Sequence, residues 1–317
     1  MRAAVLVEPR AVRVERVARP EPGPGQMLVR VTGCGVCGSN LPVWVGRPWF
    51  RYPVEPGGSG HEAWGRVEAA GPGVTALRAG QSIAFLGNRG FADFAIAEVD
   101  QCVVLPATLE GVAFPGEALG CAFNIARRSR VDAGQTVAVI GIGFLGALLV
   151  RLFSQRGARV IAIGRRRWSL DLARAEGAAE VVPMEDHTAI IDRVRALTEG
   201  RLCDRVVEVV GEQWPLDLAG ELTAERGTLV IAGYHQDSPR SVNMQLWNWR
   251  GLDVVNAHER APRVYRRGIE EAVAEAASGR LDVRRYVTHR VPLEQAADAF
   301  RLMEQRPDGF LKAVVVP

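Results

Sequence analysis

The chain has 317 residues, enough for two domains, of which 48% are hydrophobic and 24% charged, as in ordinary globular proteins. Its net charge of +3 comes almost entirely from arginines in short clusters with acids between them, so we expect no nucleic-acid partner. No run approaches 18 apolar residues and the first residues lack a secretory apolar block, so we expect no membrane partner either.

Cysteines are few. The five present, an odd number, do not fit a secreted disulfide framework, so we expect a reduced, cytoplasmic protein. Cys34 and Cys37 have C-x-x-C spacing within VTGCGVCGSN. That spacing alone fits a redox pair, half of a structural zinc site, or one metal ligand beside a bystander.

The first third of the chain, up to about Pro106, is rich in glycine and proline and carries short alternating segments. These segments read as strands separated by turns, whereas helical periodicity is absent apart from a short stretch near GSNLPVWVG. A β-rich domain is therefore predicted here. Its clearest strands cover residues 27–33, 61–71, 81–87 and 91–99.

The period then changes. Helical and strand patterns alternate from residue 115 to residue 258, which favours a parallel, doubly wound α/β sheet. Helices are predicted at 115–129, 141–157 and 169–178, and strands at 136–140, 158–164, 205–211, 227–233 and 253–258. Beyond His258 the pattern predicts helices at 268–279 and 294–307 and a closing strand at 311–317.

A glycine-rich turn follows the first of these buried strands. The stretch Gly141-Ile142-Gly143-Phe144-Leu145-Gly146 fits G-x-G-x-x-G between a strand and a helix, the context that makes the motif meaningful. Gly141 permits the turn, Gly143 lets the backbone approach a pyrophosphate, and Gly146 lets the helix pack on the strand. The helix N-terminus, with Phe144 and Leu145, offers N–H groups to the phosphate oxygens.

The second strand of this fold ends at Ile163 and is followed by Gly164-Arg165-Arg166-Arg167. A chain that binds NAD usually has an acid here, which accepts hydrogen bonds from the adenosine ribose. Gly164 instead leaves room for a 2′-phosphate, which Arg165 and Arg166 can clamp. A charge-assisted hydrogen bond contributes about 1.5–3 kcal/mol, so NADP(H) is expected over NAD(H).

Four residues have side chains that suit a zinc ion: Cys37, His61, Glu62 and Glu117. A catalytic zinc needs about three protein ligands and one open position. The spacing of these residues does not by itself show that they converge.

The order of the motifs resembles that of the medium-chain dehydrogenase/reductase superfamily, in particular its zinc-dependent alcohol and polyol dehydrogenases. The matching stretches cover essentially the whole chain: GCGVCGSN, GHEAWGRVEAAGPGV, GFADFAIAE, GEALGCAFN, TVAVIGIGFLG and VTHRVPLEQAADAF…LKAVVV. The resemblance implies a GroES-like catalytic domain of residues 1–126 and 259–317, split around a Rossmann domain of residues 127–258. The active site is then expected in the cleft between them.

The resemblance also implies one catalytic zinc held by Cys37 and His61, with Glu62 and Glu117 as the remaining candidate ligands. Cys121 lies one helical turn after Glu117 and is an alternative ligand, although a buried structural role is favoured. Cys34 does not match a ligand position, and a redox C-x-x-C belongs at a helix start in another fold. Cys34 is therefore interpreted as a small buried side chain.

Three departures from the family pattern stand out. The lobe that binds a structural zinc in many relatives is replaced by LGNRG, which excludes that second metal site. Asn40 stands where the family usually has an aspartate that supports the histidine ligand, so a lower metal affinity is expected. Pro42 occupies the position of the proton-relay histidine of classical alcohol dehydrogenases. Ser39 remains as the hydroxyl expected to pass the proton.

The sequence thus predicts a zinc-dependent oxidoreductase that transfers hydride between NADP(H) and a secondary alcohol or ketone, with a lean towards polyol- or sugar-like substrates. A zinc-free quinone or enone reductase, or a non-catalytic NADPH-binding protein, are the alternatives. The strand at residues 253–258 is where relatives pair edge to edge, so a homodimer or homotetramer is expected. His235, in AGYHQ, is the remaining histidine expected to approach the nicotinamide.

Overall fold

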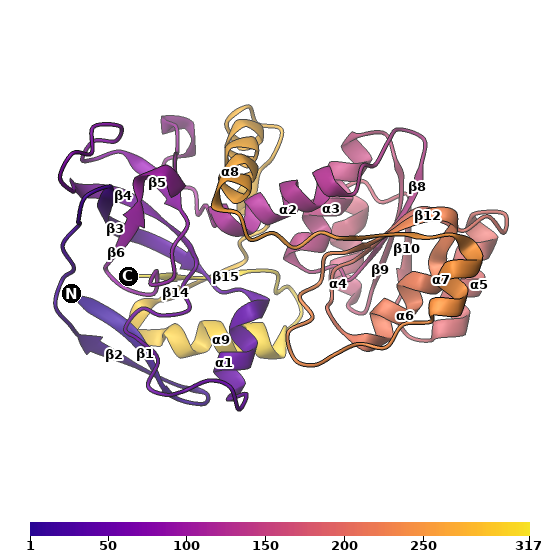
Figure 1. The fold of residues 1–317 in the computed structure, drawn as a ribbon, viewed down its shortest axis with the longest axis horizontal. Helices are drawn as coiled ribbons and strands as arrows, with labels where there is room; N and C mark the ends of the chain where they lie inside the picture. Colours follow the sequence, from indigo (N-terminus) through magenta and orange to yellow (C-terminus); the bar gives the residue numbers. More distant parts are fainter. The chain divides into compact units, whose positions relative to one another are not determined.

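The computed structural model describes all 317 residues, and the chain divides into two compact units (Figure 1). The β-rich unit comprises Met1–Cys121 and Arg260–Pro317, and the parallel-sheet unit comprises Ala122–Glu259. The expected first boundary, at residue 126, lies within helix α2 (Gly116–Arg128), which begins in one unit and ends in the other. The second boundary lies one residue later than expected.

The β-rich unit is built on a seven-stranded sheet of order β14-β15-β3-β4-β5-β7, with β6 paired to β3, and on the separate hairpin β1-β2. All pairs are antiparallel except β14 with β15. Its strands are β1 Arg2–Glu8, β2 Ala11–Arg16, β3 Gln26–Gly35, β4 Glu62–Ala70, β5 Ser82–Phe85, β6 Phe94–Glu98, β7 Cys102–Val104, β14 His289–Pro292 and β15 Ala313–Val316.

Three α-helices complete this unit, α1 Leu41–Val45, α8 Pro262–Ala277 and α9 Ala296–Gln305, together with short 3-10 turns such as η1 Gly38–Asn40. Trp44 of α1 stacks on Phe300 of α9 with ring centroids 5.2 Å apart, and Phe91 meets the edge of the same ring at 5.4 Å. All three rings are fully buried, and burial of each contributes roughly 1.5–3 kcal/mol. The C-terminal helix thereby fixes the segment that follows β3.

The last strand matters for the site. Val315 and Val314 of β15 pair with Cys34 and Gly35 at the end of β3. This register brings Lys312, immediately before β15, beside the segment that leaves β3. Residues separated by almost the whole chain therefore meet at one end of this sheet.

The parallel-sheet unit contains six parallel strands in the order β10-β9-β8-β11-β12-β13. The chain runs outward from β8 to β10 and then restarts at β11, so the order reverses between β8 and β11, where open α/β sheets bind ligands. The strands are β8 Thr136–Ile140, β9 Arg159–Gly164, β10 Glu180–Pro183, β11 Cys203–Glu208, β12 Thr223–Ile231 and β13 Asp253–Asn256. Besides α2, the helices are α3 Phe144–Gln155, α4 Arg167–Ala175, α5 His187–Leu197, α6 Gln213–Leu222 and α7 Met244–Arg250.

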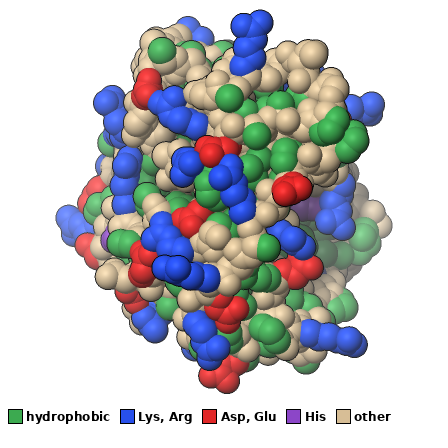
Figure 2. All heavy atoms as spheres, turned by 90° about the vertical axis from the view of Figure 1, so that its left-hand side faces the viewer, with side chains coloured by type: hydrophobic (Ala, Val, Ile, Leu, Met, Phe, Trp, Pro, Cys, Tyr) green, Lys and Arg blue, Asp and Glu red, His purple; other side chains and the backbone are tan.

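The surface agrees with the composition. On the face seen in Figure 2, basic and acidic side chains alternate and no extended basic tract forms. None of the helices combines the length and the apolar character that crossing a bilayer requires.

Candidate metal and nucleotide sites

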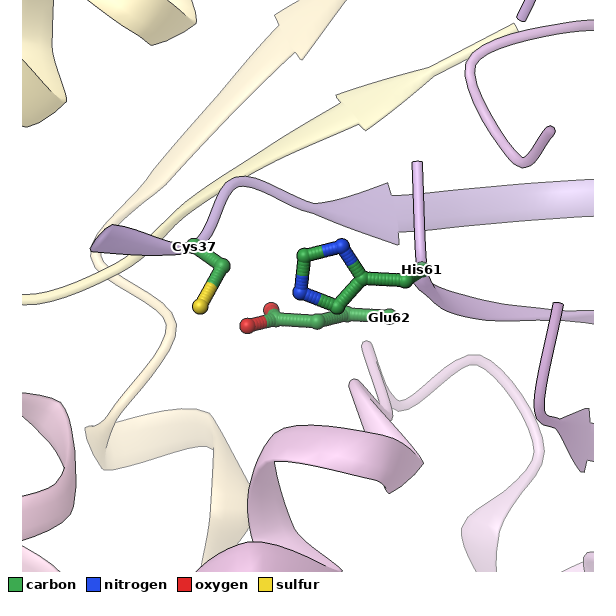
Figure 3. Close-up of side chains that lie close together, drawn as sticks. All are labelled: Cys37, His61 and Glu62. Atoms are coloured by element: carbon green, nitrogen blue, oxygen red, sulfur yellow. The ribbon is translucent and has the colours of Figure 1, made fainter. Parts of the chain in front are cut away.

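Three of the four expected zinc ligands come together in the β-rich unit. Cys37 follows β3, and His61 and Glu62 stand at the start of β4. Because these strands pair antiparallel with Gly35 opposite Glu62, the exit of one lies beside the entrance of the other. The sulfur, an imidazole nitrogen and a carboxylate oxygen all lie within 4.8 Å of one another, and Figure 3 shows the three side chains facing one another.

The imidazole of His61 is oriented by the backbone. Its Nδ1 lies 2.9 Å from the carbonyl oxygen of Ser59, so Nδ1 donates its proton there and Nε2 is the nitrogen that a metal would bind in place of a proton. Ser39 Oγ lies 3.4 Å from that Nε2. This is the tautomer that a metal-binding histidine needs, and the residue expected to carry the proton is beside it.

Asn40 connects the two segments that supply the ligands. It is buried, its Oδ1 accepts a hydrogen bond of 2.8 Å from the Cys37 backbone N–H, and its Nδ2 donates to the Ser59 carbonyl at 2.9 Å. That carbonyl also accepts from His61. The amide therefore positions both ligands without touching the imidazole, a role that the expected aspartate could share only in part, because it has no N–H.

The negative charges around His61 favour a bound cation. Burial lowers the pKa of His61, but the hydrogen bond with Cys37 and the negative charges of Cys37, Glu117 and Glu62 raise it, with a net result of about 10. A proton is thus held where several anionic donors meet. Thiolate, imidazole and carboxylate at this separation fit Zn²⁺, which takes such donors at about 2.0–2.3 Å.

Glu62 has a partner that no motif in the sequence predicts. Both of its oxygens lie within hydrogen-bonding distance of Lys312 Nζ, at 2.7 and 2.8 Å, and the same ammonium lies 3.3 Å from the Val36 carbonyl. The pair is buried, and a Cβ on Gly35 would lie 1.9 Å from Glu62 Oε2. Burial lowers the pKa of Lys312, but the charge of Glu62 and its neighbours raises it overall, so the ammonium stays charged. The only available signal was that Lys312 is the single lysine of an arginine-rich chain.

Glu117 stands outside this three-residue group, in the first turn of α2. Its Oε1 accepts a hydrogen bond from Cys121 Sγ at 3.2 Å. Burial raises its pKa, His61 acts in the opposite direction, and the charge of Glu62 raises it further. Glu117 and Cys121 thus face each other on one helix side, and Glu117 is close enough to sense the imidazole charge.

Other residues near Cys37 have different roles. Cys34 is completely buried in β3, where it pairs with Ala63 of β4, and all five cysteines are free thiols. Trp44 belongs to the core, whereas Trp49 is about half exposed. Between β5 and Phe91 the chain has only residues 86–90, so it lacks the cysteine-rich lobe of relatives.

The glycine motif lies in the parallel-sheet unit as its spacing predicts, between β8 and α3. Gly141 has φ 102°, which favours glycine, and a Cβ on Gly146 would lie 2.0 Å from the Gly141 carbonyl oxygen. Gly143 is exposed, with no atom within 4 Å of the place where its Cβ would be. Phe144 is buried and Leu145 partly buried in the first turn of α3. The turn thus has an open backbone at the helix N-terminus.

Arg165 and Arg166 stand at the carboxyl ends of the parallel strands, as the glycine turn does. β9 pairs with β8 in parallel, with Ile163 opposite Ile140, so Gly164 and Arg165 leave the sheet beside the glycine turn. Gly164 is buried, and its Cβ would come within 3.2 Å of Ile142. Arg165 is exposed and Arg166 partly exposed at the start of α4.

Comparison with known proteins agrees with this picture. Residues 23–139 match the alcohol dehydrogenase GroES-like domain, and residues 145–275 match the zinc-binding dehydrogenase domain. The chain is 27% identical to a protein named as a zinc-binding alcohol dehydrogenase in Mycobacterium tuberculosis, covering 100% of this chain and 89% of that one. It is 25% identical to sorbitol dehydrogenase of Bacillus subtilis, covering 100% and 97%.

A crystal structure of a zinc-binding dehydrogenase from Sinorhizobium meliloti, bound to NADP, superimposes with a TM-score of 0.84 at 28% identity, covering 100% of this chain and 99% of that one. The chain belongs to the zinc-binding dehydrogenases of the medium-chain dehydrogenase/reductase superfamily. Its two units are accordingly a GroES-like domain and a Rossmann domain, as the motif order predicted. Its relatives support an oxidoreductase of the dehydrogenase type.

Proposed function

We propose that this protein is a zinc-dependent dehydrogenase that transfers a hydride between NADP(H) and a secondary alcohol or ketone, of the polyol or sugar-like kind. The observation that carries this proposal is the convergence of Cys37, His61 and Glu62 within 4.8 Å. A zinc-free quinone or enone reductase has no use for a thiolate, an imidazole and a carboxylate gathered in this way. The relatives named as alcohol and sorbitol dehydrogenases support the substrate class.

The residues that would hold the zinc are Cys37 and His61, with Glu62 or Glu117 as the carboxylate. When bound, the metal supplies Lewis acidity to the substrate oxygen, and the nicotinamide supplies or takes the hydride. Ser39 lies beside His61 Nε2 and would take the proton of the substrate hydroxyl and pass it to water. Asn40 fixes the Cys37 and Ser59 backbones and so maintains this arrangement.

The choice of carboxylate depends on Lys312. In the structure both Glu62 oxygens are hydrogen-bonded to the ammonium, and each still has a lone pair. Glu117 accepts only the weak hydrogen bond of a thiol. We therefore propose that Glu117 is the carboxylate that completes the site, because it would bind without losing an ion pair, and that Glu62, whose charge is shared with Lys312, is the alternative.

The preference for NADP(H) rests on Gly164, Arg165 and Arg166 at the carboxyl end of β9. An NAD-binding chain would hold the ribose with an acidic side chain at the end of β9, and this chain has none there. Arg165 is exposed immediately after β9. The structure of the Sinorhizobium meliloti relative bound to NADP supports the same preference.

A homodimer is the assembly we propose. Strand β13 lies at the edge of the six-stranded sheet, and its residues are mostly exposed, with Val254 at 42%. Trp249 at the end of α7, a few residues before β13, is 86% exposed. An exposed edge strand flanked by a large apolar side chain fits pairing with the same strand of a second copy.

The test is to purify the protein, measure its zinc by elemental analysis, and assay a panel of alcohols, polyols and ketones with NADP(H) and NAD(H). About one zinc per chain and turnover of a secondary alcohol or polyol that stops on chelation are expected. Zinc far below one per chain together with reduction of quinones or enones would show the zinc-free alternative to be correct. Tight NADPH binding without turnover on any substrate would show a non-catalytic protein.

A further inference from the structure

A buried carboxylate joins two loops of the Rossmann unit. Glu208 ends β11 and is completely buried. Its Oε1 accepts hydrogen bonds from the backbone N–H groups of Val210 at 2.5 Å and Gly211 at 2.7 Å. Its Oε2 lies 3.0 Å from His235 Nε2, in the loop that follows β12. The loop after β11 and the loop after β12 are thus both attached to one side chain.

Arg240 determines the tautomer of that histidine. Its Nε donates to His235 Nδ1 over 3.0 Å, and because a guanidinium only donates, Nδ1 must be the acceptor. The ring proton therefore lies on Nε2 and is donated to Glu208. A second nitrogen of Arg240 donates to the Gly211 carbonyl at 2.9 Å. Arg240 therefore also contacts the loop that follows β11. Arg240, His235 and Glu208 form a continuous hydrogen-bonded series, here called the loop clasp.

The loop clasp contacts the glycine turn through Val210. A Cβ on Gly141 would lie only 2.5 Å from Val210 Cγ2, so the valine held by Glu208 packs against the turn. The clasp also lies at the carboxyl ends of β11 and β12, on the opposite side of β8 from β9 and Arg165. A dinucleotide bound across this reversal places its two halves on the two sides.

We propose that His235 and Arg240 are positioning residues for the cofactor, holding residues 209–212 and 232–243 in the conformation that receives the nicotinamide half of NADP(H). This inference rests on the proposed use of NADP(H). The adenosine half, on the Arg165 side, does not depend on the clasp. Neither side chain is a catalytic residue, because each acts through the loops.

The inference is tested with two ligands that differ by the nicotinamide half, NADPH and adenosine 2′,5′-bisphosphate. For His235→Leu and Arg240→Met we expect the Kd for NADPH to rise about tenfold or more, the loss typical of a charge-assisted hydrogen bond. The Kd for the bisphosphate should stay within about twofold. Because the adenosine contacts are left intact, the ratio of the two constants reports the clasp and not general stability.

His235→Gln keeps an N–H that can reach Glu208 and should recover part of the NADPH affinity. Arg174→Met is the matched control: Arg174 pairs with Asp171 on the exposed face of α4, so both constants should stay as in the wild type. If His235→Leu does not fold, Arg240→Met and His235→Gln still give the ratio.

Each contrary result has its own meaning. An unchanged Kd for NADPH in Arg240→Met and His235→Leu overturns the inference while the proposed function stands. A parallel loss of both ligands shows that the clasp only supports the fold and also overturns it. If the wild-type protein binds neither ligand, NADP(H) is not its cofactor, and both the proposed function and this inference are wrong.

Discussion

Lys312 Nζ lies 2.7 Å from one oxygen of Glu62 and 2.8 Å from the other, although 250 residues separate the two in sequence. Both side chains are almost inaccessible to solvent, with 4% and 0% exposed. The ion pair joins the last strand of the chain to the segment that holds the proposed metal ligands. In a chain with so many arginines, its single lysine is the residue placed there.

Removing the ammonium of Lys312 should lower the free energy of unfolding. Lys312→Met leaves Glu62 charged and buried without a partner, and breaking such a pair typically costs about 3–5 kcal/mol. Urea denaturation of the zinc-free protein measures the loss in the free energy of unfolding. Arg301→Met, which breaks an exposed pair with Asp298, should cost less than about 1 kcal/mol.

The double variant Lys312→Met/Glu62→Gln shows whether the cost comes from the unpaired charge. It should be more stable than Lys312→Met alone, because no buried carboxylate is left without a cation. A double variant as unstable as the sum of the single ones would mean that Lys312 stabilises the fold by packing and not through Glu62.

Sequence patterns predicted most of the elements that carry the sites. The strand before the glycine turn was expected at 136–140 and lies there, because Thr136 is followed by four apolar residues that end at the glycine turn, a pattern typical of a short buried strand. The patterns gave no element at β10, α5, α6 or α7. Helix α7 has only seven residues, too few to show helical periodicity, and Pro215 in the first turn of α6 hides the helical pattern.

Some residues of the candidate sites could be predicted from the sequence, and others could not. Cys37, His61 and Glu62 follow from motif order, since strands β3 and β4 pair next to each other in the fold. The Lys312–Glu62 pair depends on the pairing of β15 with β3, a tertiary relationship that no local spacing encodes. For the same reason, the link from Asn40 to Ser59 and the clasp at Glu208 became visible only in three dimensions.

The two cysteines of the C-x-x-C stretch should behave differently. Cys37→Ser removes a thiolate ligand, so bound zinc should fall from about one to less than about 0.1 per chain after dialysis, with activity lost in parallel. Cys34→Ala removes a buried thiol that is not among the converging ligand atoms and should keep its zinc. Elemental analysis of the two proteins decides the question, and a Cys34→Ala protein that loses its metal would reverse the assignment.

Coenzyme preference should depend on the arginines after β9. Arg165→Gln combined with Arg166→Gln should raise KM for NADPH by about tenfold or more and leave KM for NADH nearly unchanged, because only NADPH carries the 2′-phosphate. Arg167→Gln is the control, since that side chain is 95% exposed and lies 3.9 Å from Asp171. Equal effects on the two coenzymes would place the arginines outside the 2′-phosphate site.

The pair of Asp93 and Arg2 predicts a change of stability with pH. Burial raises the pKa of Asp93, but hydrogen bonds from the Arg2 side chain and backbone lower it below its usual value overall. A lowered pKa in the folded state means that this stabilisation is present above the ordinary aspartate value, about 3.9, and is lost as the pH falls through the folded value. Asp93→Asn should cost about 1 kcal/mol at neutral pH, and this cost should become smaller as the pH falls below about 3.9. Thermal unfolding from pH 2 to pH 7 measures this, and a cost that does not vary with pH would contradict it.

The edge strand β13 gives the last prediction. If two copies pair along it, a charge at Val254 should separate them, because each arginine of Val254→Arg would stand near its counterpart across the two-fold axis. Light scattering coupled to size exclusion should then give a monomer for Val254→Arg and a dimer or tetramer for the wild type. Val242→Arg adds the same charge at a similarly exposed apolar position outside the strand and should not change the mass. Because the ligands of the proposed metal lie in the GroES-like unit, a monomeric variant should keep its zinc, and an unchanged oligomer in Val254→Arg would move the interface to another surface.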